Sequence, residues 1–336
     1  MPKPCNAVFF GSDPIGLPIL EWGLGDSRLT WKGIFTQPDR ARGRGKKVIP
    51  NAIKVFAEAH KIPVLQSSRP GPDMITWMSE HEIELGFVLA YGHILKQGHL
   101  DAPRLGMWNF HGSALPALRG ASPIESALAS GLDKTAMTLM RMVLKMDAGP
   151  ILDQEWVEIE RSDTSPILRT KMGEACLPLL DRQLDSIIEG EAQPEEQDHT
   201  AATYCRKLEK SDGVMDFSLP AVVLENRMRA CIPWPGSGFL FEGQTIKVGK
   251  GSVIPGQIEA SPGTVFIPEN RSSIEIRCGS DSILCLELQR PGGKMLPAAD
   301  FLRGFPLESG TKLDIVSSKI WEQASPFPHK PSVRPT

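Results

Sequence analysis

The chain has 336 residues, of which 41% are hydrophobic and 23% charged, a composition typical of a globular protein with room for two domains. Its net charge of −3 argues against a strongly basic nucleic-acid-binding protein, and no apolar segment approaches the roughly 20 residues of a membrane span. The N-terminal segment also lacks the long apolar core of a signal peptide, so a cytoplasmic protein without membrane association is expected.

Short apolar segments alternate with helical patterns through the first half of the chain. The segment 85–90 is continuously apolar, as expected for a strand that is covered on both faces. Strand, helix and strand at this spacing predict an α/β fold with a mostly parallel sheet and crossover helices. Strands are expected at 7–10, 34–35, 64–65, 85–90, 107–111, 137–142 and 151–159, and helices at 17–24 and 162–189.

The composition changes after residue 190. Residues 191–205 are polar without a periodic pattern and are interpreted as a linker between a first domain, 1–190, and a second, 206–322. The second domain contains several short β-like runs separated by Gly and Pro turns, which predicts a small barrel. The proline-rich tail, 323–336, is predicted to be disordered. The six cysteines form no Cys-x-x-Cys pair and no zinc-type cluster, so no metal site or disulfide is expected.

Asn109 and His111 form the first candidate site. They are two residues apart in the expected strand 107–111, so both side chains point to one face. Ligands bind at the carboxyl edge of an open parallel sheet, and the pair is expected there in an exposed cleft. An amide that can donate to a developing oxyanion, beside an imidazole, suits acyl transfer. The alternative is that the pair only stabilises a turn.

Asp147 lies in the segment Met146–Pro150, between the last two expected strands. The sequence Asp-Ala-Gly-Pro is also typical of a β-turn with Asp at its first position, and taken alone this is the simpler interpretation. Asp147 is therefore a candidate only in combination with Asn109 and His111.

Five basic residues fall within eight positions of a glycine-containing segment that has no acidic residue before Glu58. Lys and Arg side chains on a flexible loop can neutralise a phosphate backbone, which favours a phosphate-binding loop. The alternative is a solvated surface loop. The five residues, called the basic segment below, are Arg40, Arg42, Arg44, Lys46 and Lys47.

Taken together, these segments resemble the folate-dependent formyltransferases over about residues 7–308. Asn-x-His followed by a later Asp marks formyl transfer in that family, and the basic segment is similar to that of the members that formylate methionyl-tRNA. The resemblance implies a Rossmann-like formyltransferase domain followed by an OB-like C-terminal barrel. The segments that carry it include Gln37–Arg40, Gly43–Lys47, Asn109–Pro116, Arg119–Ile124, Met146–Pro150 and Pro233–Gly236.

The resemblance implies a role for each candidate residue. Asn109, His111 and Asp147 match the catalytic residues, with 10-formyltetrahydrofolate as formyl donor and no metal. The basic segment matches the loop that reaches the acceptor end of initiator methionyl-tRNA, and no obligate protein partner is implied. Ala114 stands where the family usually has a leucine, which makes the apolar wall smaller there. Folate contacts are implied for Ser113, Ala114, Leu115 and Pro116, and for the sheet edge at Leu89, Tyr91 and Gly92.

Three other classes of protein fit part of the pattern. A formyltransferase acting on a sugar-nucleotide amine would keep the three candidate catalytic residues but has no need of the basic segment. A nicotinamide dehydrogenase is disfavoured because Gly11–Gly16 lacks the G-x-G-x-x-G spacing. A non-catalytic RNA-binding module explains the basic segment and the barrel, but not Asn109, His111 and Asp147 together.

Overall fold

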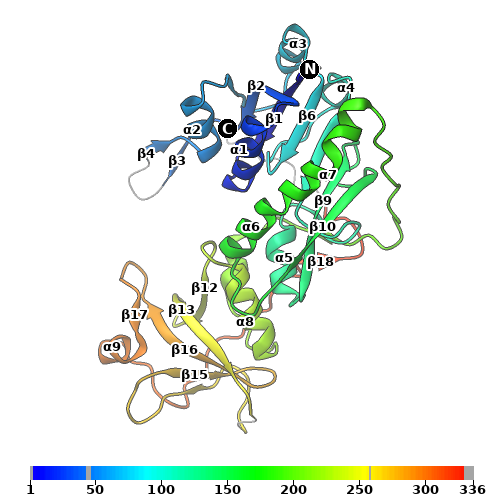
Figure 1. Ribbon diagram of the computed structural model, residues 1–336. Coiled ribbons are helices and arrows are strands. Elements are labelled where there is room, and N and C mark those ends of the chain that lie inside the picture. Colours follow the sequence, from blue (N-terminus) through cyan, green and yellow to red (C-terminus); the bar gives the residue numbers. More distant parts are fainter. Residues whose placement is uncertain (1–2, 43–46, 257–258, 329–336) are drawn as a thin grey trace. The chain divides into compact units, whose positions relative to one another are not determined.

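The computed structural model of the protein describes residues 3–42, 47–256 and 259–328 (Figure 1). Its internal contacts divide the chain into two compact units. The first contains Met1–Pro123, Lys134–Glu158 and Arg169–Tyr204, and the second contains Ile124–Asp133, Ile159–Leu168 and Cys205–Thr336. The segment 191–204, predicted as part of a linker, thus belongs to the first unit. Of the predicted disordered tail, residues 329–336 lie outside the described residues.

The first unit is built on a seven-stranded sheet in which five neighbouring strands run parallel (Figure 1). The two strands at one edge are antiparallel to their neighbours. The prediction of a mostly parallel sheet is confirmed. In spatial order the strands are β10 (Ile151–Glu158), β9 (Lys134–Arg141), β7 (Met107–His111), β6 (Leu85–Leu89), β1 (Cys5–Gly11), β2 (Leu29–Thr36) and β5 (Val64–Gln66).

Every residue of β1 and β6 is buried, because helices cover both faces of the central strands. Phe10 packs with Met74 of α3 on one face. Phe9 points to the other face and packs edge-to-face on Trp31, whose indole N–H donates to the Leu20 carbonyl of α1. The helices and short strands around this sheet are η1 (Pro14–Gly16), α1 (Leu17–Gly25), β3 (Arg40–Arg42), β4 (Lys47–Ile49), α2 (Ala52–Ala59), α3 (Pro72–Glu80), α4 (Gln97–Asp101), β8 (Arg119–Gly120) and β11 (Tyr204–Cys205).

The chain order places a topological switch point beside β1. From β1 the chain proceeds to β2 and β5 on one side, and then returns to β6 and β7 on the other. The crossover connections therefore diverge at the carboxyl ends of β1 and β6, where open α/β sheets bind ligands. Ser12 follows β1 there, and Tyr91 follows β6.

The helix predicted at 162–189 is two helices, α6 (Ser165–Glu174) and α7 (Cys176–Glu189). Pro178 explains the break. Proline has no N–H to donate to the carbonyl four residues earlier, and its ring would clash with that carbonyl, so it is tolerated only in a helix's first turn. A new helix therefore begins two residues before it.

The second unit contains an antiparallel sheet, which confirms the prediction of a small β domain. Its core includes Phe217, Phe239 and Leu288, each fully buried. The strands pair in the order β12 (Ser237–Phe241), β13 (Gln244–Ile254), β16 (Ser282–Gln289), β15 (Ile274–Arg277) and β14 (Val265–Phe266), with β17 (Leu296–Pro297) on β16. The remaining elements outside the seven-stranded sheet are α5 (Pro123–Ala129), η2 (Lys210–Gly213), α8 (Ala221–Ala230), α9 (Ala298–Arg303) and β18 (Glu322–Gln323).

Within the described ranges, no helix is long and apolar enough to cross a membrane. The same residues contain no group of three or more His, Cys, Asp or Glu side chains that could hold a metal ion. All six cysteines lie in the described residues, where they are buried and form no disulfide.

Candidate active site

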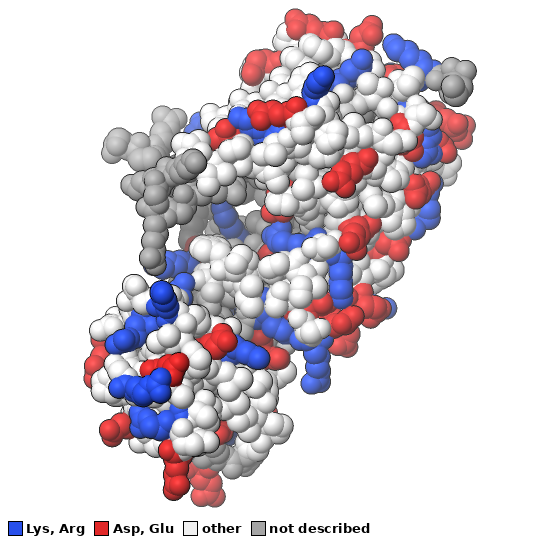
Figure 2. Space-filling view, turned by 60° about the vertical axis from the view of Figure 1, so that its left-hand side comes forward, with Lys and Arg blue, Asp and Glu red and all other residues white. Residues whose placement is uncertain are grey.

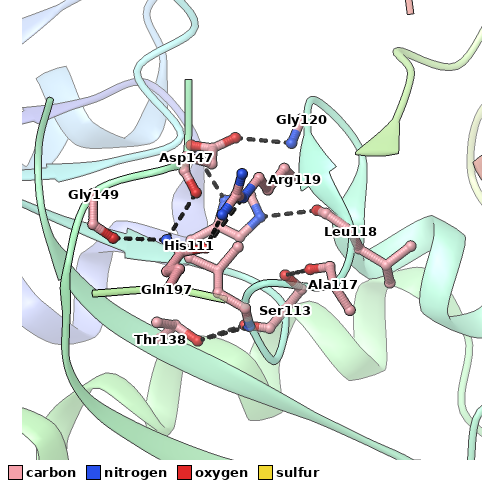
Figure 3. A network of polar contacts seen from close by, with 11 residues as sticks. His111, Ser113, Ala117, Leu118, Arg119, Gly120, Thr138, Asp147, Gly149 and Gln197 are labelled. Carbon is pink, nitrogen blue, oxygen red and sulfur yellow. Dashed lines mark hydrogen bonds and ion pairs between the residues drawn. The ribbon is translucent and has the colours of Figure 1, made fainter. Parts of the chain in front are cut away.

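His111 is the last residue of β7, at the carboxyl edge of the parallel strands. It was expected in an exposed cleft, but its side chain is only 6% exposed. Its Nε2 lies 3.0 Å from the carbonyl oxygen of Leu118, and its Nδ1 lies 3.7 Å from Oδ1 of Asp147 (Figure 3). The structure therefore brings together two residues that are 36 positions apart in the sequence.

These contacts fix the roles of the two ring nitrogens. A carbonyl oxygen only accepts, so Nε2 of His111 carries a proton and donates to Leu118. Nδ1 is then the nitrogen that gains or loses a proton. The 3.7 Å between Nδ1 and the Asp147 carboxylate is too long for a direct hydrogen bond but within the range of an ion pair.

Asn109 lies on the same face of β7 as His111, because the two are separated by one residue of a strand. Its side chain is half-buried, and within the described part of the chain its amide makes no hydrogen bond. A half-buried amide with free donors at the carboxyl edge is suited to bind an oxygen atom of a substrate.

Asp147 lies in the connection between β9 and β10 with a positive φ of 50°. Asp adopts this left-handed conformation more readily than most residues. Its Oδ2 accepts a hydrogen bond of 2.8 Å from the backbone N–H of Gly120 (Figure 3). The carboxylate is thus held on one side by a backbone donor and faces His111 with its other oxygen.

Two buried residues that the sequence analysis did not name as site residues complete this network. Gln197 donates from Nε2 to the backbone carbonyls of Asp147 and Gly149, at 3.0 and 2.7 Å. Arg119 is fully buried and donates from Nε and Nη2 to Oε1 of Gln197, at 3.1 and 2.5 Å. Gln197 lies in the segment that was predicted as a linker, which has no pattern that could have revealed it.

Gly149 has no space for a side chain, since a Cβ there would collide with the carbonyl oxygen of Arg141. Gly149→Ala should therefore displace the β9–β10 connection, lower the free energy of unfolding by about 1–3 kcal/mol and reduce kcat. Chemical denaturation together with turnover measures both effects. Gly25→Ala is the matched control, because a Cβ at Gly25 meets nothing. Wild-type stability and turnover for Gly149→Ala would show that this connection adjusts freely.

The segment 113–116, implied as a folate contact, is a tight loop after β7. Ser113 is fully buried and donates from Oγ to the carbonyl of Ala117 at 2.6 Å. Thr138 of β9 donates to the carbonyl of Ser113 at 2.6 Å, and Leu115 is also buried. Only Ala114 and Pro116 of this segment are partly exposed side chains. A ligand here would meet those two side chains and the loop backbone.

The edge of β6 at 89–92 also offers mainly backbone. Leu89 is buried, and the Tyr91 ring lies in the core, edge-to-face on Phe10. Burial raises the pKa of Tyr91 to about 12. The Tyr91 carbonyl accepts from Oγ of Ser12 and Nε2 of Gln37, at 3.5 and 2.9 Å. Gly92 is exposed with a positive φ of 76°. The side chains of Leu89 and Tyr91 are thus part of the core, and the folate contacts predicted for Leu89, Tyr91 and Gly92 stay predictions.

The described ends of the basic segment lie in the antiparallel strands β3 and β4 of a β-hairpin, in which Arg42 pairs with Lys47. Arg40 is exposed, whereas Arg44 and Lys46 lie outside the described residues. The start of this hairpin is firmly held. Lys54 binds Asp39 at 2.7 Å, and this hydrogen bond lowers the pKa of Asp39.

The start of the hairpin lies near the edge of β6. Gln37 donates to the Tyr91 carbonyl, as described above. Burial and, second, the positive charge of Arg40 lower the pKa of His93. The basic segment thus starts at the switch point, although its tip is not described.

A cavity of about 530 Å³ opens beside the switch point, between the start of α1 and α2. It contains none of the three candidate catalytic residues. Its walls are mostly apolar, so the chemistry of the site is assigned to the network around His111 rather than to this cavity. It is lined by Ser12, Pro14, Leu17, Glu21, Pro50, Asn51, Ala52, Val55 and Phe56.

Comparison with known proteins identifies the class to which this site belongs. Residues 25–179 match the formyl transferase family, and residues 207–306 match the formyl transferase C-terminal domain. These two matches cover most of the chain. The protein is therefore a member of the formyltransferases, which are transferases of one-carbon groups.

Several solved structures share the fold. An N-formyltransferase from Helicobacter canadensis, in complex with folinic acid and dTDP-3-aminofucose, aligns with a TM-score of 0.61 and 18% identity over 86% of this chain and 100% of its own. WlaRD, a sugar 3N-formyl transferase crystallised with dTDP and 5-N-formyl-THF, aligns with a TM-score of 0.60 and 17% identity over 86% and 98%.

HypX from Aquifex aeolicus aligns with a TM-score of 0.59 and 14% identity over 90% of this chain but only 48% of its own. The chain thus spans about half the length of HypX. At these identities the three structures establish the fold, and the acceptor of the formyl group has to be inferred from the site.

Proposed function

We propose that the protein transfers a formyl group from 10-formyltetrahydrofolate to the free amino group of initiator methionyl-tRNA. The observation that carries formyl transfer is a buried imidazole 3.7 Å from a carboxylate, on the strand that also holds Asn109, whose amide makes no hydrogen bond among the described residues. The choice of tRNA as acceptor rests on the basic segment. Incubation with 10-formyltetrahydrofolate and charged initiator tRNA, followed by mass analysis of the released amino acid, tests it. If the methionine stays unformylated in a preparation that transfers the formyl group to another amine, the assignment of the acceptor is wrong.

The chemistry requires a neutral amine and a stabilised oxyanion. An α-amine has an ordinary pKa of about 7.7–8.0, so part of it is neutral near pH 7. The amine nitrogen bonds to the formyl carbon, that carbon's bond to the folate N10 breaks, and the amine's proton passes to N10. Asn109 donates to the developing oxyanion. His111 and Asp147 carry the proton, directly or through a water molecule between them.

The donor fits the carboxyl edge of the first unit. The segment 113–116 presents a backbone loop whose shape is fixed by Ser113 and Thr138, with the apolar side chains of Ala114 and Pro116 partly exposed. Such a wall suits the flat, apolar part of a folate. Two formyltransferases of the same fold were crystallised with folate derivatives, which supports a folate donor.

The basic segment supports tRNA as the acceptor. Its basic residues leave the switch point on a hairpin whose start is fixed by Asp39 and Lys54. A polyanion bound by this segment would therefore be held close to the carboxyl edge where His111 lies. Figure 2 shows Lys and Arg side chains on the visible face of the second unit, interspersed with Asp and Glu. We also propose that the second domain is OB-like and contacts the same tRNA. The proposed domain limits are 1–190 and 206–322, and the proposed location is the cytoplasm.

A sugar-nucleotide amine is the second candidate acceptor. The observation in its favour is that two structures with the same fold are sugar formyltransferases, one in complex with dTDP-3-aminofucose. This acceptor would use the same network of Asn109, His111 and Asp147. It leaves the basic segment without a function, which is why we prefer tRNA.

Neutralising the basic segment should separate the two acceptors. Replacing Arg42, Arg44, Lys46 and Lys47 with Gln should weaken tRNA binding and flatten its salt dependence, because each lost phosphate contact lowers the log–log salt slope by about 0.7–0.9. Arg44→Lys should also weaken binding, since a guanidinium can bind a phosphate through two N–H groups and an ammonium cannot. tRNA affinity across a salt series measures both effects.

Folate binding is the internal control for these variants and should stay at the wild-type level. The matched control for lost charge is Lys61→Gln, which removes an exposed cation between α2 and β5, at the edge of the sheet opposite the carboxyl ends of the parallel strands. An unchanged affinity and salt slope in the quadruple variant would move the acceptor to a small amine.

A further inference from the structure

Gln197 holds the backbone on both sides of Ala148. One amide group donates to the carbonyl oxygens of Asp147 and Gly149 at 3.0 and 2.7 Å, and both N–H positions of Nε2 are thereby used (Figure 3). The side chain is only 6% exposed, so water does not compete effectively for these bonds.

The orientation of the Gln197 amide is determined by Arg119. A guanidinium has donors and no acceptor, and its Nε and Nη2 both point at Oε1 of Gln197. Nε2 must therefore face the carbonyls of Asp147 and Gly149. Arg119 is itself fixed, since it is fully buried and also bonds Nδ1 of His199 at 2.9 Å and the hydroxyl of Tyr204 at 3.4 Å.

The same short strand also holds the Asp147 carboxylate. Gly120 follows Arg119 in β8 and donates its backbone N–H to Oδ2 of Asp147 at 2.8 Å. Residues 119–120 therefore hold Asp147 twice, directly at its carboxylate and through Gln197 at its backbone. Gln197 is also anchored, because Glu195 exchanges two backbone hydrogen bonds of 2.7 Å with Ile151 at the start of β10.

Packing alone does not hold this connection. The residues before Asp147 expose their apolar side chains, with Leu144 at 60% and Met146 at 45%. Asp147 also has a left-handed backbone, which a free chain populates rarely. Hydrogen bonds from buried donors are therefore the main restraint on the position of its carboxylate.

We infer that Gln197 and Arg119 are positioning residues for formyl transfer: they hold Asp147 in its left-handed conformation, with its carboxylate 3.7 Å from Nδ1 of His111. The inference rests on the proposed role of Asp147 in the reaction. Neither residue touches the reacting atoms, and both act through the backbone of 147–149.

Two substitutions of Gln197 separate positioning from folding. Gln197→Leu keeps the volume but removes both donors and the acceptor. Gln197→Glu keeps an acceptor for Arg119, now as an ion pair, but turns a carboxylate oxygen toward the two carbonyls. Gln183→Leu is the matched control, since the amide of Gln183 also donates from Nε2, in this case to the Asp153 carboxylate, but lies on α7.

Kinetics with 10-formyltetrahydrofolate and the acceptor amine form the first readout. Both Gln197 variants should lose roughly 10- to 100-fold in kcat with little change in KM, because a small displacement of a catalytic group affects the transition state most. The pH profile of kcat should also change shape in both Gln197 variants. Gln183→Leu should keep the wild-type kcat. Wild-type kcat and pH profile in both Gln197 variants would overturn the inference.

The amide of Gly120 gives a readout that does not depend on activity. In protein labelled with ¹⁵N-glycine, exchange of this N–H should accelerate roughly ten-fold or more in both Gln197 variants, as for loss of a hydrogen bond to a charged group. Arg119→Lys should have the same effect, and the double variant Arg119→Lys with Gln197→Leu should add little. If the exchange rate of the Gly120 N–H is unchanged in folded Gln197 variants, the positioning role of Gln197 is wrong even if formyl transfer is confirmed. Accelerated exchange in a protein without formyl transfer would refute only the proposed function.

Discussion

Replacing His111 with Ala should lower kcat by roughly 100-fold or more. Nδ1 of the His111 ring faces the Asp147 carboxylate, and Nε2 is bonded to the backbone carbonyl of Leu118. Removing the ring takes away the proposed proton carrier. Single-turnover kinetics with saturating donor measures the chemical step directly.

The burial of His111 requires a stability control for this variant. A cavity at a 6% exposed side chain lowers the free energy of unfolding, whatever the chemistry. His99 is the matched residue, because it is 2% exposed and its Nε2 also bonds a backbone carbonyl, that of Gly71, away from the site. His99→Ala should lose stability and keep kcat. Equal turnover for the two variants would remove His111 from the mechanism.

Asp147→Asn should be similarly damaging, with a loss of about 10²–10⁴-fold in kcat. Asparagine adopts a left-handed backbone as readily as aspartate, so the φ of 50° is retained. The neutral amide cannot stabilise an imidazolium at 3.7 Å, and its contact with the Gly120 N–H is weaker. The measurement is kcat across pH, compared with Asp153→Asn.

Asp153 is a suitable reference because it lies within β10 and its carboxylate is also partly buried and hydrogen-bonded, by Arg182 and Gln183 of α7. Asp153→Asn should affect stability alone. If Asp147→Asn kept both its rate and its pH profile, Asp147 would be the turn residue of the simpler interpretation.

The sequence predicted the sheet well because its strands are local apolar runs. The run 85–90 became β6, and the pair Asn109 and His111 ends β7 as its alternation required. The spacing could not show how deeply His111 lies. Its burial depends on Leu118 and Asp147, which come from loops whose paths are determined by tertiary contacts.

Arg119 and Gln197 could not be found from the sequence for the same reason. They are 78 residues apart, and neither lies in a periodic pattern. A buried arginine is rare, but the sequence offers no sign that Arg119 is buried. The sequence also contains no sign that the side chains of Ser113 and Tyr91 are buried, and the folate contacts of both residues remain predictions. The roles of the basic segment remain predictions.

The β9–β10 connection has consequences for altering acceptor preference by design. Its last residues tolerate little change, because Gln197 holds the backbone of Asp147 and a side chain at Gly149 would collide with the Arg141 carbonyl. Val143, Leu144 and Met146 precede Asp147 directly in the chain and expose their apolar side chains. Randomising Val143, Leu144 and Met146 in a combinatorial library would vary the surface presented to an incoming amine while leaving the catalytic geometry intact.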